Sequence, residues 1–200
     1  MGRIVVTESI SLDGVMQAPG RPDEDTRGGF AHGGWGRPYA DEVMGRTMAE
    51  RMSAGGPGVL VLGRRTYEDL YSFWPQQTDG NQYTEALNNT TKYVASRTLS
   101  EPLPWVNSRL LAGDAVQAVA ELRESAGHVG IIGSGDLVRQ LARHGLIDEY
   151  LLLIHPLVLG SGQRLFAEEG AYAPLRLVDS VTTTTGVTIA AYRPVPKEEG

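Results

Sequence analysis

Three short stretches of glycine, serine and arginine follow apolar segments of the chain, at positions where they could bind phosphate groups. They are Gly63-Arg64-Arg65-Thr66, Ser96-Arg97 and Gly133-Ser134-Gly135-Asp136-Leu137. The first and the third also begin predicted helices, where backbone N–H groups lack partners and the helix dipole favours an anion. Arginine adds a forked guanidinium group, which can bind a phosphate through two hydrogen bonds. Together these residues predict a site for a phosphorylated ligand.

Each stretch has a simpler interpretation when it is taken alone. The turn at residues 133–135 is not the dinucleotide-binding fingerprint, because Val138 stands where the third glycine would be, and a tight strand-to-helix turn explains it. Arg64 and Arg65 could be solvated residues at a helix start, and Arg97 a surface residue. All three stretches nevertheless follow predicted strands, and the carboxyl ends of parallel strands form the ligand crevice of an α/β sheet. This coincidence favours a binding site.

Two carboxylates and one aromatic residue are candidates for the part of the site where a substrate would bind and react. Asp13 and Asp41 could anchor an N–H group or assist protonation of a nitrogen atom. Trp35 lies in a polar, glycine-rich segment, residues 17–38, which is long enough to act as a lid. The alternatives stay open: an ordinary turn residue for Asp13, a charge that complements the helix dipole for Asp41, and a buried anchor of a surface loop for Trp35.

Alternating strands and helices must position these residues. Apolar and β-branched runs predict strands at residues 3–9, 59–62, 91–95, 108–111, 129–132, 150–154, 176–181 and 187–192. Helical spacing predicts helices at residues 39–54, 64–73 and 83–88. A fourth helix follows Asp114 as its cap, and a fifth carries Leu137 and Leu141 and ends at Gly145.

This alternation predicts a three-layer α/β fold, with helices on both faces of a mixed, mainly parallel sheet. Residues 129–154 have the pattern of a βαβ unit, because a glycine turn and a helix separate two apolar strands. The last two strands follow each other without a helix, so we expect an antiparallel pair at the C-terminal end. We expect a single domain over residues 1–193 and a frayed tail over residues 194–200.

Composition excludes several classes of protein. The chain of 200 residues is 41% hydrophobic and 21% charged, as in an ordinary globular domain. It contains no cysteine, which excludes disulfides and cysteine-based metal sites, and its 4 histidines show no metal-ligand spacing. The net charge of -6 argues against nucleic acid as a partner. Because no signal peptide or membrane-length apolar span is visible, we expect a cytoplasmic protein with no membrane partner.

The same stretches resemble motifs of a known family. Residues 62–68, Leu-Gly-Arg-Arg-Thr-Tyr-Glu, are similar to the cofactor-binding turn of dihydrofolate reductases. Ser96-Arg97 and Gly133-Ser134-Gly135 resemble the second cofactor turn and the paired-glycine turn of those enzymes. Residues 11–14, 146–150 and 156–166 look like the C-terminal reductase domain of the bifunctional riboflavin-biosynthesis deaminase-reductase. The chain is identified on these residues as a stand-alone protein of the dihydrofolate-reductase-like family that resembles this reductase domain.

The resemblance implies the dihydrofolate-reductase-like fold, NADPH as cofactor and a homodimer. It implies an enzyme, of the dihydrofolate reductase or 5-amino-6-(5-phosphoribosylamino)uracil reductase type, that transfers hydride to a pterin-like or pyrimidine-like heterocycle. Arg97 would bind the 2′-phosphate, the turn at residues 133–135 the pyrophosphate, and the nicotinamide would lie near Asp13 and residues 17–38. An alternative from another class is a non-catalytic protein that binds NADPH or a flavin-like ligand, as a sensor or a sequestering module.

The sequence departs from the riboflavin enzyme at two points. The ligand cysteines of the zinc deaminase partner are absent. Residues 68–75, Glu-Asp-Leu-Tyr-Ser-Phe-Trp-Pro, stand where the riboflavin reductase has a segment that binds the ribose phosphate of its substrate. The second departure puts recognition of a ribosyl phosphate in question.

Overall fold

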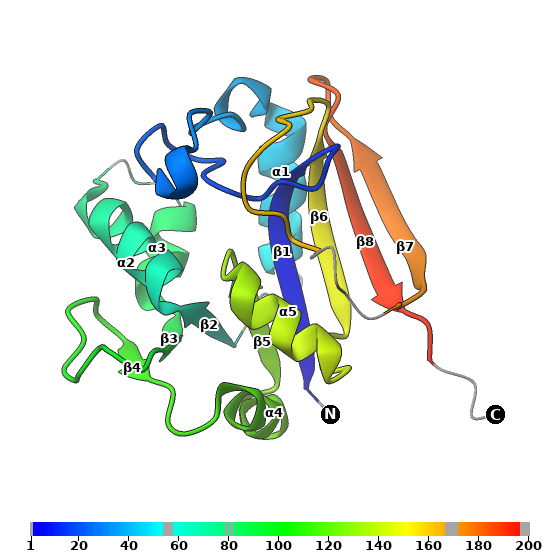
Figure 1. The fold of residues 1–200 in the computed structure, drawn as a ribbon. Helices are drawn as coiled ribbons and strands as arrows, with labels where there is room; N and C mark the ends of the chain where they lie inside the picture. The colour runs from blue at the N-terminus through cyan, green and yellow to red at the C-terminus, as the bar shows by residue number, and fades with distance from the viewer. Residues whose placement is uncertain (1, 54–57, 79, 81, 167–171, 197–200) are drawn as a thin grey trace.

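A single mixed sheet organises the chain in the computed structural model, which describes residues 2–53, 58–78, 80, 82–166 and 172–196. The 8-stranded sheet has the order β4-β3-β2-β5-β1-β6-β8-β7 (Figure 1). The strands are β1 (Arg3–Ser11), β2 (Val59–Gly63), β3 (Thr91–Ala95), β4 (Ser108–Leu110), β5 (His128–Ile132), β6 (Glu149–His155), β7 (Leu175–Thr182) and β8 (Thr188–Pro194). Strands β1 to β6 pair in parallel, and β8 pairs antiparallel with both β6 and β7. The predicted mixed sheet with an antiparallel C-terminal pair is confirmed.

Helices cover both faces of this sheet (Figure 1). They are α1 (Glu42–Ser53), α2 (Arg64–Phe73), α3 (Gln82–Asn89), α4 (Ala115–Ala126) and α5 (Gly135–Arg143), with 3-10 turns η1 (Arg27–Gly29), η2 (Arg37–Tyr39) and η3 (Trp74–Gln76). No helix among the described residues combines the length and the apolar character that crossing a membrane requires. The chain is therefore built as a layered α/β domain around β1 and β5.

The core has two sides because neighbouring residues of a strand point to opposite faces. In β2, Val59 and Val61 pack on the side of α4 and α5, whereas Leu60 and Leu62 pack on the side of α2 and α3. A third cluster joins β6 and β8 to α1. Leu141 of α5 is fully buried, which contributes about 1.5–3 kcal/mol of hydrophobic free energy. These apolar contacts hold α2 and α5 in place at the ends of their strands.

Strand β1 occupies the centre of the sheet, between the two strands of the predicted βαβ unit. It pairs in parallel with β5 through Thr7 and Ile132, and with β6 through Ser11 and His155. The unit over residues 129–154 is therefore a crossover from β5 through α5 to β6, with β1 inserted between its strands. Beyond Thr7, β1 extends past the end of β5. Residues 8–11 of β1 therefore pair with β6 on one side and with no described strand on the other.

The boundaries of several elements differ from their predicted positions. The first helix begins at Glu42, and not at Tyr39, because η2 ends at Tyr39 and Asp41 accepts a hydrogen bond from the backbone N–H of Met44 at 2.8 Å. Its predicted end at Ala54 lies outside the described residues. The final strand extends through Pro194, so the predicted start of the tail at residue 194 is wrong by one residue. Residues 197–200 of that tail lie outside the described residues.

Candidate functional site

A large cavity lies at the carboxyl ends of β1, β2, β3 and β5. It has a volume of about 1990 Å³. A typical small-molecule site has about 300–1,000 Å³, so this cavity has room for a dinucleotide and a second molecule. All the residues predicted to bind a cofactor line it: Gly63, Arg64, Arg65, Thr66, Ser96, Arg97, Gly133, Ser134, Gly135, Asp136 and Leu137. The three sequence stretches therefore meet in one place.

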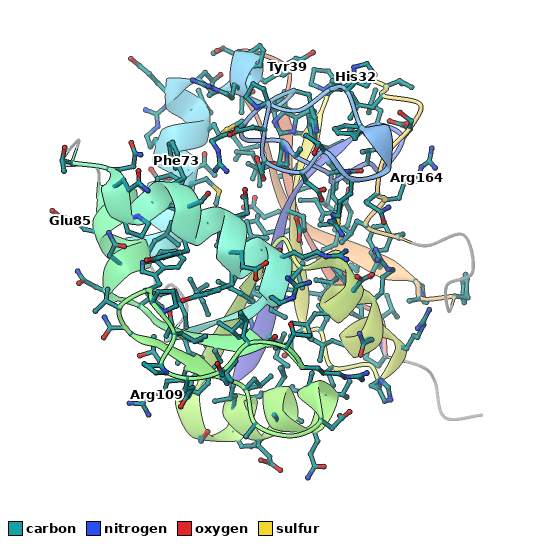
Figure 2. The ribbon with its side chains drawn as sticks, turned by 60° about the vertical axis from the view of Figure 1, so that its left-hand side comes forward. His32, Tyr39, Phe73, Glu85, Arg109 and Arg164 are labelled. Carbon is teal, nitrogen blue, oxygen red and sulfur yellow. The ribbon has the colours of Figure 1, made fainter. Side chains whose placement is uncertain are left out.

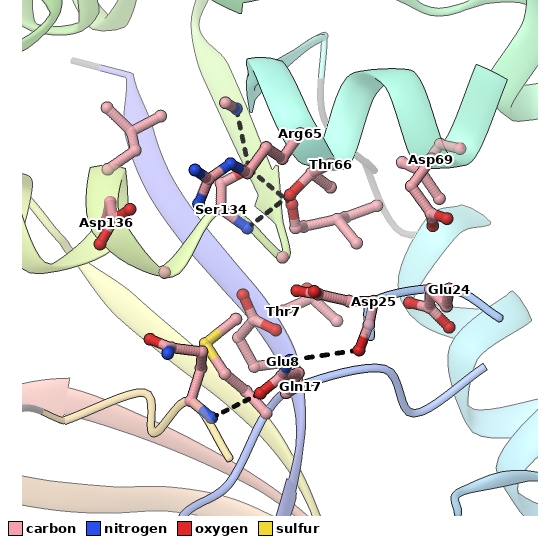
Figure 3. A pocket seen from close by; sticks show the side chains of 18 of the residues that line it. Thr7, Glu8, Gln17, Glu24, Asp25, Arg65, Thr66, Asp69, Ser134 and Asp136 are labelled. Carbon is pink, nitrogen blue, oxygen red and sulfur yellow. Dashed lines mark hydrogen bonds between the residues drawn. The ribbon is translucent and has the colours of Figure 1, made fainter. Parts of the chain in front are cut away.

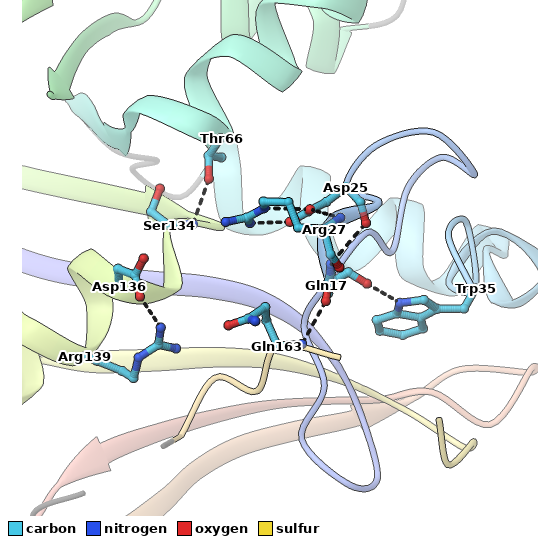
Figure 4. A network of polar contacts seen from close by, with 9 residues as sticks. All are labelled: Gln17, Asp25, Arg27, Trp35, Thr66, Ser134, Asp136, Arg139 and Gln163. Carbon is cyan, nitrogen blue, oxygen red and sulfur yellow. Dashed lines mark hydrogen bonds and ion pairs between the residues drawn. The ribbon is translucent and has the colours of Figure 1, made fainter. Parts of the chain in front are cut away.

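The first turns of α2 and α5 are joined to each other by side-chain hydrogen bonds. Ser134 donates its backbone N–H to Thr66 Oγ1 at 2.9 Å, and its own Oγ accepts from the N–H of Gly63 at 2.9 Å (Figures 3 and 4). Ser134 adopts a left-handed backbone with φ of 63°, which turns the chain sharply between β5 and α5. These bonds fix the two helix starts side by side at the cavity.

Both helix starts present backbone donors to the cavity. No side chain of a described residue caps α2 or α5. The N–H groups of Gly135, Asp136 and Leu137 form no hydrogen bond with another described residue, as is usual in the first turn of an uncapped helix. Two helix dipoles thus direct their positive ends to the same region, which favours an anion there.

Arginine side chains supply formal positive charge near these helix starts. Arg65 and Arg97 line the cavity, and neither forms an ion pair with a residue that the structure describes. Arg64 is paired with Glu68 of its own helix, with 2.8 Å between Nη1 and Oε2. Ser96 Oγ accepts the N–H groups of Thr98 and Leu99, which shapes the turn that carries Arg97. The geometry and charge of this end of the cavity suit a ligand with several phosphate groups.

Asp13 binds the backbone of a neighbouring loop and does not line the cavity. Its carboxylate accepts hydrogen bonds from Ser11 Oγ at 2.6 Å and from the N–H groups of Leu159 and Gly160 at 3.0 and 2.9 Å. The Ser11 bond is the first cause of a pKa lowered to about 2. Arg164, which also contacts Asp13, lies at the outside of the molecule (Figure 2). Asp13 therefore joins the turn after β1 to the loop after β6 through hydrogen bonds.

Asp41 fastens α1 to the β7–β8 hairpin and does not line the cavity either. One carboxylate oxygen caps α1 through the N–H of Met44, and the other accepts from Thr184 N at 2.7 Å and Thr184 Oγ1 at 2.6 Å. These bonds lower the pKa of Asp41 to about 2, and the bond from the Thr184 side chain is the largest cause. An ionised carboxylate with these bonds stabilises the junction of helix and hairpin.

Trp35 anchors the long loop from within. It is buried, donates its Nε1–H to the carbonyl oxygen of Gln17 at 2.7 Å, and packs edge-on against His155, with 5.0 Å between ring centroids (Figure 4). Gln17 in turn donates to the carbonyl oxygens of Asp25 and Arg27. Trp35 is not among the cavity residues, whereas residues 23–27 of the same loop are. The loop thus forms one wall of the cavity and is held by Trp35 behind it.

Glu8, which the sequence reasoning did not select, lies in the cavity wall. It exposes 5% of its surface, and its Oε1 has no hydrogen-bond partner among the described residues. Burial, and then the nearby charge of Glu24, raises its pKa well above the usual range. The sequence contains a signal for this burial. Glu8 occupies the position between Val6 and Ile10 in an alternation that begins at Ile4, and these three apolar residues are buried. A carboxyl at an inward position of a central strand requires a partner.

The fold and this cavity define an α/β protein of the dihydrofolate-reductase-like class. The chain belongs to the RibD C-terminal domain family, whose sequence model matches residues 3–189. It is 28% identical over 140 residues to the uncharacterized protein YyaP of Bacillus subtilis (strain 168), covering 66% of this chain and 72% of that protein.

Solved structures share the fold. A putative riboflavin biosynthesis protein from Shewanella sp. PV-4 superposes with a TM-score of 0.67 at 21% identity, covering 97% of this chain and 99% of that one. Dihydrofolate reductase from Enterococcus faecalis, solved in complex with NADP(H), superposes with a TM-score of 0.59 at 14% identity, covering 96% of each chain. At these identities the likeness establishes the architecture alone.

Proposed function

We propose that the chain is an NADPH-dependent reductase that transfers hydride to a pterin-like or pyrimidine-like heterocycle. The observation that carries the proposal is the pair of uncapped helix starts, joined by Thr66 and Ser134. Beside them lie Arg65 and Arg97, which form no ion pair within the part of the chain that the structure describes. Membership of the RibD C-terminal domain family supports it, as do neighbours that include a riboflavin biosynthesis protein and a dihydrofolate reductase.

The residues present fit the phosphate groups of NADPH. The N–H groups of Gly135, Asp136 and Leu137 would hold the pyrophosphate, and Arg97, at the end of β3, would hold the 2′-phosphate. Bound NADPH supplies the hydride from its nicotinamide ring. The protein contributes orientation, and the wall formed by residues 23–27 limits the access of water to the acceptor.

Comparison of NADPH with NADH tests this proposal. Fluorescence or calorimetric titration should give tighter binding of NADPH than of NADH to the wild-type protein. Arg97→Ala should weaken NADPH binding far more than NADH binding, because only NADPH carries the 2′-phosphate. Arg109→Ala is the matched control, since Arg109 is an exposed arginine on β4 outside the cavity (Figure 2). Absence of NADPH binding, or equal losses for the two nucleotides, would contradict the assignment.

Turnover assays separate the reductase from the alternative of a binding protein. Oxidation of NADPH is followed with a panel of dihydrofolate, oxidised pterins and aminopyrimidines. Oxidation that depends on one member of the panel supports the reductase. Tight binding of NADPH without oxidation across the panel favours a sensor or a sequestering protein, and would leave the cofactor site itself intact.

The outer strand β7 supports a homodimer. It is the last strand of the sheet, so one of its edges has no partner strand among residues 2–53, 58–78, 80, 82–166 and 172–196. Leu177 and Val178 on this strand expose 50% and 39% of their surface. A second copy would cover this edge and these side chains. Light scattering coupled to gel filtration should give a dimer for the wild type and a monomer for Leu177→Asp; a wild-type monomer at micromolar concentration would overturn this assignment.

A further inference from the structure

The long loop directs one arginine side chain toward the start of α5. Arg27 begins η1 on this loop and lines the cavity together with Ser134 and Gly135. Figure 4 shows its side chain extending from the loop wall toward the turn that carries Ser134. The hydrogen bond to Asp25 is the largest cause of a raised Arg27 pKa, and the charge of Asp136, in the first turn of α5, adds to it. Arg27 therefore lies within electrostatic range of the helix start.

Asp25 holds the guanidinium of Arg27 by one edge. The Nε of Arg27 donates to Asp25 Oδ1 at 2.7 Å, and its Nη2 donates to Asp25 Oδ2. Its Nη1 forms no hydrogen bond with another residue that the structure describes. Arginine carries five N–H donors in a planar fork, so the edge formed by Nη1 and Nη2 can still bind a phosphate through two hydrogen bonds.

The backbone around Arg27 is fixed as well. The buried side chain of Gln17 donates to the carbonyl oxygens of Asp25 and Arg27 at 3.1 and 3.0 Å. Asp25 Oδ1 also accepts the backbone N–H of Arg27 at 3.1 Å. An arginine held in this way at both its backbone and its guanidinium loses little conformational entropy when it binds an anion. Arg27 is therefore preorganised for a ligand in the cavity.

The start of α5 needs a cation from another element to bind a doubly charged anion. Its backbone N–H groups are donors, but the charged side chain in its first turn is the carboxylate of Asp136. Asp136 is paired with Arg139, which also donates to the carbonyl oxygen of Arg164 at 2.8 Å. A pyrophosphate has more oxygen atoms than one helix start can bind, and a guanidinium from the loop wall can bind the others.

We propose that Arg27 binds the pyrophosphate of the nicotinamide dinucleotide through its Nη1–Nη2 edge, while Asp25 holds the guanidinium in position. The inference rests on the proposed function for the placement of that pyrophosphate at residues 135–137. It gives the long loop a part in cofactor binding, because the bound dinucleotide joins residues 23–27 to the start of α5. Arg27 and Arg97 then recognise different phosphate groups of NADPH.

Titration with NADPH and NADH tests the proposal, because both carry the pyrophosphate and only NADPH carries the 2′-phosphate. Arg27→Ala should weaken both nucleotides by the same factor, about tenfold, as for the loss of a charge-assisted hydrogen bond. Arg97→Ala should weaken NADPH far more than NADH. Arg37→Ala is the matched control, since Arg37 is an exposed arginine of the same loop and is not among the cavity residues. Affinities of Arg27→Ala equal to those of the control, or a loss confined to NADPH, overturn the proposal.

Two further variants examine how Arg27 binds. In the double variant Arg27→Ala/Arg97→Ala the two losses of NADPH affinity should multiply, because the residues bind separate phosphate groups. A double variant no weaker than Arg97→Ala would assign both residues to one phosphate and overturn the proposal. Arg27→Lys keeps the charge without the fork and should recover only part of the affinity; full recovery would contradict the two-bond contact.

Trypsin cleavage reports the contact itself. Residues 17–38 contain three arginines and no lysine, and Arg21 and Arg37 both precede proline, which blocks trypsin. The loop therefore has one susceptible bond, between Arg27 and Gly28. Saturating NADH should protect this bond in the wild-type protein, because the Arg27 side chain is then engaged by the pyrophosphate. Cleavage at an unchanged rate would overturn the proposal.

The outcomes separate this proposal from the proposed function. Binding of both nucleotides with the expected loss in Arg27→Ala, but without oxidation of NADPH across the substrate panel, would overturn the reductase and support the role of Arg27. Normal NADPH oxidation with no effect of Arg27→Ala would overturn the role of Arg27 alone. Absence of binding of either nucleotide to the wild type would overturn both.

Discussion

Thr66 and Ser134 are in direct hydrogen-bond contact although 68 positions separate them along the chain. The bond runs from the backbone N–H of Ser134 to the hydroxyl oxygen of Thr66 at 2.9 Å. Thr66 belongs to the first turn of α2, and Ser134 precedes α5. The bond therefore sets the spacing of the two helix starts to which we assign the cofactor phosphates.

Replacing Thr66 with valine should weaken both the fold and the proposed cofactor site. Valine keeps the branched shape but leaves the N–H of Ser134 without its acceptor, which costs about 1 kcal/mol of unfolding free energy. NADPH binding should weaken because the two helix starts lose their shared bond. Urea unfolding and fluorescence titration measure the two effects. Thr66→Ser retains the hydroxyl and serves as control; equal values for the two variants would argue against the role of this bond.

Gly133→Ala should destabilise the protein for two separable reasons. Gly133 has φ of +59°, and a Cβ there would lie 2.8 Å from Thr66 Cγ2. The left-handed backbone alone costs about 1–2 kcal/mol for alanine. Gly145→Ala measures this part, because Gly145 has φ of +64° and open space around its Cβ position.

The excess loss in Gly133→Ala reports the contact with Thr66. Adding Thr66→Ser to Gly133→Ala removes the Cγ2 atom and should recover part of that excess in thermal unfolding. A double variant no more stable than Gly133→Ala would show that the contact contributes nothing.

Acid should release the loops that Asp13 and Asp41 hold. Both carboxyls have folded-state pKa values of about 2, against an ordinary value of 3.8. As pH falls below about 4, the unfolded chain takes up protons first, so the unfolding free energy falls until the folded carboxyls also protonate near pH 2. The contribution is complete above about pH 5. Asp13→Asn should therefore be less stable than wild type at pH 6, with the gap closing toward pH 2 in denaturant titrations; a constant gap would contradict this.

Lys92→Met should destabilise the protein strongly. Lys92 is fully buried, and its Nζ donates to the carbonyl oxygens of Leu87 and Thr90 at 2.7 and 2.8 Å, at the end of α3. It also lies 4.4 Å from the centre of the Trp105 ring. Methionine fills the space but leaves buried carbonyls without a donor, at a cost of about 1–3 kcal/mol. A loss below about 0.5 kcal/mol in urea unfolding would exclude this capping role.

The arrangement of the sheet, and the position of the three turns at one cavity, could be predicted because local patterns carry that information. Glycine and arginine at the ends of strands indicate turns whose backbone N–H groups are accessible to a ligand. The parallel strands of one α/β sheet end at a common edge, which brings such turns together. The sequence offered a turn role for Asp13 and a helix-start role for Asp41, but it gave no local mark of their long-range contacts. Their partners Leu159 and Thr184 are distant in the sequence, with separations of 146 and 143 positions, so only the folded chain reveals that both carboxylates are engaged.

Glu8 was missed for a different reason. The expectation of a buried strand at residues 3–9 rests on its apolar and β-branched residues and takes no account of its one inward carboxyl. The period of two in a strand assigns Glu8 to the same face as Val6 and Ile10, and the structure buries all three. A charged residue at a buried position of the alternation is thus a signal that sequence alone contains.

The central position of β1 has a consequence for how the chain acquires its fold. Arg3 pairs with His128, and Ser11 with His155, so β1 leaves the ribosome well before either of its partner strands has been made. Such distant pairings close long loops and slow folding. Until then an apolar segment stays exposed on the nascent chain. We therefore expect β1 to be a segment that chaperones bind and that is prone to aggregation during synthesis.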